Sequence, residues 1–228
     1  MGIRNMKASA ESTALPAGNF SAWLSRAEAS LQSSDKGADV PCGTCKGCCR
    51  SSMFVHIEPD EAETLDRIPR LLLFPAPGRP RSHVLMGYND QGHCPMLLHG
   101  KCSIYEFRPR ACRKYDCRFF AAADTAVDAQ SQPEIARRVG RWVFDYEDEA
   151  GREAHMMVKE TAAFLKKNGD LFMKGTLPVH PVQLAALAVR IHGVFAAITA
   201  NAQKDGTAAP PAAIANAIMT ALSVPTAA

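Results

Sequence analysis

The octet Cys42-Gly-Thr-Cys45-Lys-Gly-Cys48-Cys49 holds half of the eight cysteines in this 228-residue chain. The other four follow at Cys94, Cys102, Cys112 and Cys117, and no cysteine lies outside this window. A C-x-x-C turn aims two sulfurs at a single ion, and here two such turns overlap at Cys45. The pattern predicts a metal-binding module. Eight thiolates suit two four-thiolate sites, or one site with spare cysteines.

Which metal the module takes stays open at this level, because zinc and iron–sulfur clusters both accept four cysteines. Adjacent residues of an extended segment point opposite ways, so Cys48 and Cys49 are expected to face two different sites. Four disulfides are a weaker interpretation, since they are rare in the reducing cytosol. A thioredoxin-like redox role for Cys42-Gly-Thr-Cys45 is weaker still, because two more cysteines follow within four residues.

Basic residues accompany the later cysteines. Residues 101–118 contain only two acidic residues but six basic ones. The basic residues are Lys101, Arg108, Arg110, Arg113, Lys114 and Arg118. Guanidinium groups would offset the negative charge of a thiolate–metal site and lower thiolate pKa values. A phosphate-binding patch is the rival interpretation. Histidines are secondary ligand candidates, and four lie in the window: His56, His83, His93 and His99.

The composition is that of an ordinary folded protein, with 47% hydrophobic and 21% charged residues and a formal net charge of +3. This balance argues against nucleic acid as the main partner and leaves a protein partner open. The first residues lack the apolar run of a secretory signal, so we expect a cytoplasmic protein. The most apolar stretch, about residues 182–200, is interrupted by polar side chains and is expected to be a core helix rather than a membrane span.

The fold expected from periodicity is α+β, a small cysteine-rich metal-binding module with a short β-meander, packed with a mostly α-helical C-terminal part. Residues 1–40 are expected to be a partly disordered extension with one short amphipathic helix. Residues 41–120 form the module, with strands at 53–57, 84–88, 93–98 and 102–105, a helix at 59–68 and a short helix opened by Pro109. Residues 121–205 are helical, with helices at about 133–146, 154–169 and from 181 onward. Residues 206–228 are expected to be a loosely attached Ala/Pro-rich tail.

Three stretches together resemble a family of bacterial proteins, the zinc- or iron-chelating cysteine-cluster family with C-x-x-C-x-x-C-C and C-x-I-Y-x-x-R-P-x-x-C-R motifs. They are the octet, then Gly92-His-Cys94-Pro-Met-Leu97, and then Cys102-Ser-Ile-Tyr105-Glu-Phe-Arg108-Pro109-Arg-Ala-Cys112-Arg113-Lys-Tyr-Asp-Cys117. The resemblance covers about residues 41–120. It implies zinc or iron chelation by the eight cysteines, with supporting roles for Tyr105, Arg108, Pro109 and Arg113.

Three functions are therefore considered. The first is a cytosolic protein that binds zinc or iron, including an iron–sulfur cluster, through its cysteines. The second is a metal-dependent enzyme, because flagellin lysine methylases are similar in their cysteine pattern; no catalytic residue or nucleotide-binding loop is identified. The third is a zinc-ribbon-like nucleic-acid binder, which requires a basic stripe with exposed aromatic side chains. Its candidate residues are Arg108, Arg110, Arg113, Arg118, Tyr105, Tyr115, Phe119 and Phe120.

Overall fold

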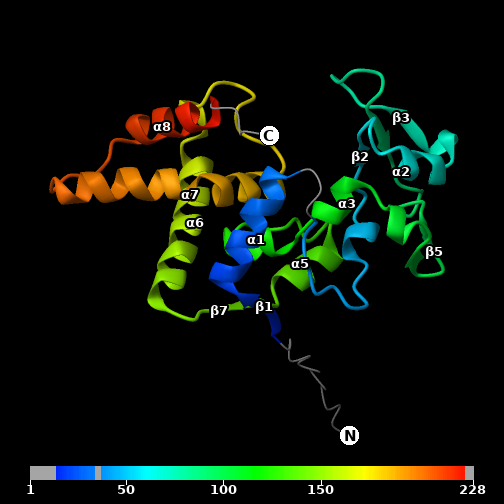
Figure 1. Cartoon of the computed structure of the whole chain (residues 1–228), viewed down its shortest axis with the longest axis horizontal. Coiled ribbons are helices and arrows are strands. Elements are labelled where there is room, and N and C mark those ends of the chain that lie inside the picture. The colour runs from blue at the N-terminus through cyan, green and yellow to red at the C-terminus, as the bar shows by residue number, and fades with distance from the viewer. Residues whose placement is uncertain (1–13, 34–36, 224–228) are drawn as a thin grey trace, which may run out of the picture.

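A computed structural model describes residues 14–33 and 37–223 of the chain. Four helices gather on one side of the molecule, α1 (Phe20–Gln32), α6 (Glu149–Lys167), α7 (Pro181–Lys204) and α8 (Pro211–Ser223). A small sheet with β2 (Val55–Ile57) and β3 (Leu73–Pro75) stands at the other end (Figure 1). Many helices and a few short sheets agree with the predicted α+β class.

The N-terminal segment is part of the main core. Strand β1 (Leu15–Asn19) leads directly into α1, and the Asn19 side chain caps that helix by accepting a hydrogen bond from the Ala22 backbone N–H at 3.0 Å. Phe20 and Trp23 on α1 are almost completely buried. The amphipathic helix predicted in residues 1–40 is therefore confirmed. The first thirteen residues of this extension, which as a whole was predicted to be partly disordered, lie outside the described part of the chain.

The helix predicted over 133–146 ends early. Helix α5 (Pro133–Val139) is followed by strand β7 (Trp142–Asp145), which pairs in parallel with β1. Trp142 and Phe144 are buried while Val143 between them is 55% exposed, which is the period of a strand. The prediction was wrong here because the partner strand β1 lies more than a hundred residues away in sequence.

Helices α6 and α7 form the body of the helical part, as predicted. Asp148 caps α6, its carboxylate accepting the Gly151 N–H at 2.8 Å, and Pro181 opens α7 at a position where it costs no hydrogen bond. Helix α7 is long and apolar enough to cross a membrane by length and composition alone. In this structure one of its faces lies in the core through Ala185, Leu187, Ala188, Val189, Ile191 and Phe195.

The C-terminal segment also differs from its prediction. Helix α8 packs against α7 and buries Ile214, Ala215 and Ile218 in the main core. The described part of the expected tail is therefore attached through a helix. Its many alanines are small side chains with high helix propensity, and the chain needs only a few larger residues to dock.

The sheets of the cysteine-rich part are shorter than predicted and differently paired. Strand β4 (Val84–Met86) lies between β2 and β3 in an antiparallel sheet, while β5 (Leu97–Leu98) pairs with β6 (Lys101–Cys102). The expected hairpin between residues 84–88 and 93–98 is therefore wrong. Helix α2 (Ala62–Arg67) and the turn η2 (Arg70–Leu72) cover the sheet, and a second small core forms beneath it: Ile57, Ile68, Met86, Met96 and Ile104.

Short helical pieces carry the cysteines between the two cores. The octet, predicted to lack regular structure, contains the 3-10 turn η1 (Gly47–Arg50). The turn η3 (Tyr105–Phe107) is followed by α3 (Arg110–Lys114), which confirms the short helix after Pro109. Helix α4 (Arg118–Ala122) then enters the main core, and the turn η4 (Gly169–Leu171) follows α6.

Candidate metal centre

The first C-x-x-C is a tight turn at the surface. The Cys45 backbone N–H donates to the Cys42 carbonyl at 3.0 Å, and the Gly47 N–H donates to the Cys45 sulfur at 3.4 Å. Gly43 between the cysteines has a φ of +55°, which a residue without Cβ adopts at little cost. A backbone N–H that donates to a cysteine sulfur orients the sulfur, so this turn suits a metal ligand.

Cys48 and Cys49 do not point away from each other as an extended segment would require. They lie in η1, where the Cys48 thiol hydrogen-bonds the Cys49 sulfur; this contact raises the pKa of Cys48 and lowers the pKa of Cys49. The premise that Cys48 and Cys49 lie in an extended segment is therefore wrong. Their other neighbours differ, however. Cys49 lies in electrostatic contact with Cys94, Cys112 and Cys102.

Cys94 and Cys102 reach the octet through the backbone and the small sheet. The Cys94 N–H donates to the Cys49 carbonyl at 2.8 Å, which ties together segments 45 residues apart in sequence. Cys102 lies opposite Leu97 in the β5–β6 pair, and both Cys94 and Cys102 pack against the small core. This arrangement places two sulfurs from the β5–β6 region beside the octet.

The supporting residues named from the motif build the turn that carries Cys112. The Arg108 guanidinium stacks over the Tyr105 ring at 4.1 Å and donates to the Tyr105 carbonyl at 2.8 Å. Arg113 donates in turn to the Arg108 carbonyl at 3.1 Å. The carbonyl of the buried Pro109 accepts the Cys112 N–H at 2.8 Å. These four residues therefore hold the start of α3 in place and do not themselves present ligands.

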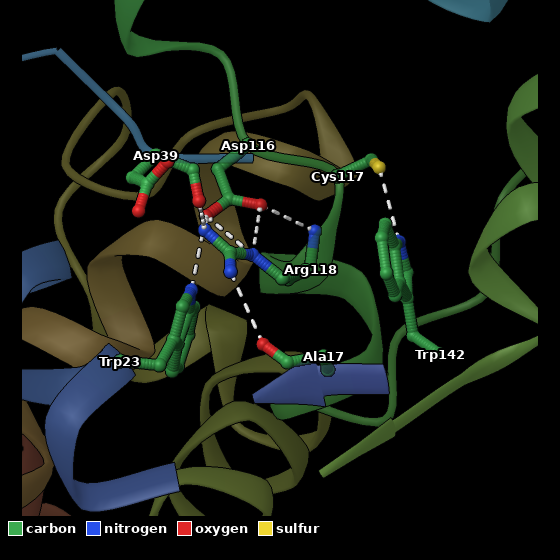
Figure 2. Close-up of polar contacts among 7 residues, drawn as sticks. All are labelled: Ala17, Trp23, Asp39, Asp116, Cys117, Arg118 and Trp142. Atoms are coloured by element: carbon green, nitrogen blue, oxygen red, sulfur yellow. Dashed lines mark hydrogen bonds and ion pairs between the residues drawn. The ribbon is translucent and has the colours of Figure 1, made fainter. Parts of the chain in front are cut away.

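Cys117 belongs to the main core. Its sulfur is turned toward Trp142 on β7 and accepts the indole Nε1–H at 3.2 Å (Figure 2). On either side in sequence, Asp116 and Arg118 form a buried ion pair at 2.8 Å. Asp116 also accepts the Trp23 indole N–H at 2.9 Å, and Arg118 donates to the Ala17 carbonyl at 3.1 Å. This network, which the sequence did not reveal, locks β1 and α1 to the segment that positions Cys117.

The cysteines fall into two neighbourhoods. Within each neighbourhood the cysteines interact electrostatically with one another. Set A contains Cys42, Cys45 and Cys117. Set B contains Cys49, Cys94, Cys102 and Cys112. Cys48 has neighbours in both sets, Cys42 in one and Cys94 and Cys112 in the other. Electrostatic interactions therefore link each of the eight cysteines to at least two others, and Cys48 interacts with members of both sets.

These neighbourhoods are not assembled ligand shells. Within residues 14–33 and 37–223, no group of three or more His, Cys, Asp or Glu side chains stands in a geometry that could hold a metal ion. All eight cysteines are free thiols. Chelation would therefore require side-chain rotations that draw the sulfurs of each set together.

The chemistry of the donor set fits a metal nonetheless. Burial, together with the smaller effects of the neighbouring Cys48, Cys94 and Cys102, raises the pKa of Cys112 to about 12, and Arg108 opposes this rise. Burial likewise raises the pKa of Cys117 to about 12, despite the Trp142 hydrogen bond. Thiols crowded in this way do not ionise near neutral pH, whereas a bound metal ion deprotonates its thiol ligands outright.

Most of the cations expected to compensate thiolate charge have other partners. Arg118 pairs with Asp116, and Arg110 forms ion pairs with Glu58 at 3.1 Å and Asp60 at 2.8 Å. Arg138, which the sequence did not single out, lowers the pKa of Cys42 against the larger effect of burial, and stacks over Trp142 at 4.6 Å. The predicted charge compensation is therefore wrong for Arg110 and Arg118.

The histidine candidates are not placed as ligands. His56 and His83 stack on each other, with 3.3 Å between Nε2 of the first and Nδ1 of the second. Of the aromatic residues named for the nucleic-acid alternative, Phe119 and Phe120 are buried, whereas Tyr105 is 58% exposed. Further exposed aromatic rings occur at Phe54, Phe74 and Tyr88, beside the three-stranded sheet.

Comparison with protein families finds a match over the cysteine-rich part of the chain. Residues 41–133 match the CxxCxxCC family. Its model is described as "Putative zinc- or iron-chelating domain". This confirms the resemblance stated from the motifs and supports metal binding in general. The CxxCxxCC match extends past Cys117 to include α4 and the start of α5. No curated protein and no solved structure matches the chain.

Proposed function

We propose that this protein binds zinc or iron in the cytoplasm through its eight cysteines, arranged as two four-thiolate centres. Set A with Cys48 would hold one centre, and set B the other. Cys48 is assigned to set A because set B already has four sulfurs, the number that tetrahedral zinc or an iron–sulfur cluster takes from cysteine. When bound, the metal would supply either structural cross-linking or, for iron, redox chemistry.

The observation that carries the proposal is the convergence of all eight thiols from four segments of the chain. Backbone hydrogen bonds and short turns hold these segments, with the Cys94 N–H bonded to the Cys49 carbonyl and Cys112 carried by the turn after Pro109. Cys112 and Cys117, whose pKa values are raised to about 12, stay protonated near neutral pH without a cation. A metal ion in each set would deprotonate these thiols and bind them.

Metal analysis of protein purified without oxygen tests the proposal directly. Two zinc ions per chain and no visible absorption would indicate two zinc centres. Iron, acid-labile sulfide and a broad band near roughly 400 nm would indicate iron–sulfur clusters. Protein with no bound zinc or iron, which also takes up neither on reconstitution, would overturn the proposal.

The assignment of sulfurs to two centres is tested by Cys48→Ser and Cys49→Ser. Each variant should lose about one of two centres, because each replaces one ligand of a different four-thiolate site. His180→Ala, a change at an exposed residue before α7, is the control and should keep both. If Cys48→Ser loses both centres while Cys49→Ser loses one, Cys48 bridges the two metals and the simple division is wrong.

An enzymatic role is the second candidate, and one observation favours it. A hollow of about 490 Å³ lies beside Cys102, lined by Arg67, Ser103, Tyr105 and Glu106 among others. An open space beside a proposed metal ligand is what a substrate would need. A change in the spectrum of metal-loaded protein on adding candidate small molecules would support it, and an unchanged spectrum would favour a structural centre.

The nucleic-acid alternative receives less support. It needs a continuous basic stripe at Arg108, Arg110, Arg113 and Arg118 with exposed aromatic residues. Arg118 is 4% exposed, and Arg110 is paired with two carboxylates. We therefore do not propose it for these residues.

A further inference from the structure

Tyr115 carries a buried hydroxyl for which the fold provides no partner. The residue follows Lys114 at the end of α3 and packs partly against the main core. Although the side chain as a whole is partly exposed, its hydroxyl oxygen is buried and has no hydrogen-bond partner among the described residues. A buried hydroxyl without a partner costs about 1–3 kcal/mol, so its presence in a packed region calls for an explanation.

Tyr115 lies two residues before Cys117 in the chain. Its hydroxyl interacts electrostatically with the Asp116 carboxylate and with the thiols of Cys117, Cys48 and Cys45. All three belong to the first proposed centre, and the Cys117 sulfur already accepts the Trp142 indole N–H. A phenol is a hydrogen-bond donor at neutral pH, and metal-bound thiolates are acceptors of such bonds.

We propose that the Tyr115 hydroxyl is a positioning donor for the first metal centre, giving a hydrogen bond to one of its metal-bound cysteine sulfurs. Together with Trp142 it supplies two side-chain donors on the protein side of set A, while Cys42 and Cys48 face the surface. Donors to thiolate sulfur withdraw charge from it, which stabilises an anionic centre and raises its reduction potential if the metal is iron. The inference rests on the proposed metal-binding function.

Tyr115→Phe is the test, because it removes one oxygen and keeps the ring. In metal-free protein, kept reduced, the variant should melt at the same or a higher temperature than wild type, since only a partnerless buried hydroxyl is lost. Competition with a chromophoric chelator should show zinc affinity at one of the two sites lower by about tenfold, the usual cost of removing a group that bonds to a ligand. Tyr88→Phe, at a tyrosine that is 42% exposed, is the matched control and should change neither quantity.

Combining Tyr115→Phe with a cysteine variant shows whether the loss of zinc affinity belongs to set A. In Cys45→Ser protein, which lacks a ligand of that set, Tyr115→Phe should have no further effect on zinc binding. In Cys49→Ser protein the tenfold loss should remain. Equal zinc affinity of Tyr115→Phe and wild type would overturn the inference and leave the metal function standing, as would equal destabilisation of metal-free and zinc-loaded protein. Wild-type protein that binds neither zinc nor iron would overturn both.

Discussion

At the scale of single residues, the main core contains a buried histidine, His155, whose pKa is lowered. His155 on α6 stacks on Phe20 with ring centroids 4.2 Å apart, and its Nδ1 lies 2.7 Å from the Tyr146 hydroxyl oxygen. Burial, followed by the charge of Lys159, lowers the pKa of His155 to about 4 from its ordinary value of 6.5. The imidazole is therefore a neutral member of the aromatic core at physiological pH.

This pKa predicts how stability depends on acid. The unfolded chain takes up a proton at His155 below pH 6.5, while the folded chain resists protonation until about pH 4. The stability that the neutral histidine contributes is therefore complete above pH 6.5 and is lost progressively as the pH falls toward 4. For this one group, the loss in unfolding free energy between pH 7 and pH 5 should be about 2 kcal/mol.

Urea unfolding of metal-free wild type and His155→Gln at pH 7 and pH 5 measures this loss. The variant should be less stable at pH 7 but should have a flatter pH dependence. The same pH dependence in both proteins would show that His155 does not contribute to it. Metal content at pH 7 should be unchanged, since His155 is not among the proposed ligands.

At the scale of elements, α8 tests whether the C-terminal segment belongs to the fold. The Ala-rich sequence of this segment predicts a tail. In the structure, however, Ile214, Ala215 and Ile218 of α8 pack in the main core, and α8 also contacts η4. Ile218 is completely buried. Docking of one apolar stripe is what gives a short helix its stability, because isolated helices of this length are marginal in water.

Ile218→Ala should therefore destabilise the whole protein. We expect a loss of about 2–5 kcal/mol in the free energy of unfolding, the usual cost of replacing a buried isoleucine by alanine. Chemical denaturation measures it, with the exposed Asn216→Ala on the same helix as the control. A loss under about 0.5 kcal/mol, as at a surface site, would mean that the segment is loosely attached, as the sequence suggested.

At the scale of the whole molecule, the cysteines join two separate cores. Cys117 lies in the main core, while Cys94 and Cys102 pack against the smaller one. The buried Asp116–Arg118 pair links the segment of Cys117 to β1 and α1 (Figure 2). Metal bound by these cysteines would therefore connect parts of the chain that otherwise share few apolar contacts.

Removing the metal should loosen both sides of this junction together. Binding to the folded state alone contributes stability that a chelator takes away, so the melting temperature of metal-free protein should fall. Hydrogen exchange should rise jointly in residues 42–50, 94–102 and 110–118, while the buried face of α7 stays protected. Faster exchange confined to residues 42–50 would contradict the idea that the metals join the two cores.

Local patterns in the sequence were enough to predict the family resemblance and the longer helices. The C-x-x-C spacing, the Arg108-Pro109 turn and the stripes of α1, α6 and α7 depend on residues a few positions apart, and such neighbours fix turns and helix faces directly. The same local information carried the resemblance to the zinc- or iron-chelating family, which residues 41–133 match.

Several features of this protein were decided only by the tertiary structure, because they depend on contacts between residues that are distant in sequence. The pairing of β1 with β7 turns Trp142 into a strand residue and a donor to Cys117. The order β2-β4-β3, the docking of α8 and the division of the cysteines into two sets arise in the same way. Local periodicity carries no record of which distant segment will meet a given strand, helix or thiol, and for that reason Tyr115, Trp142 and Arg138 emerged only once the chain was folded.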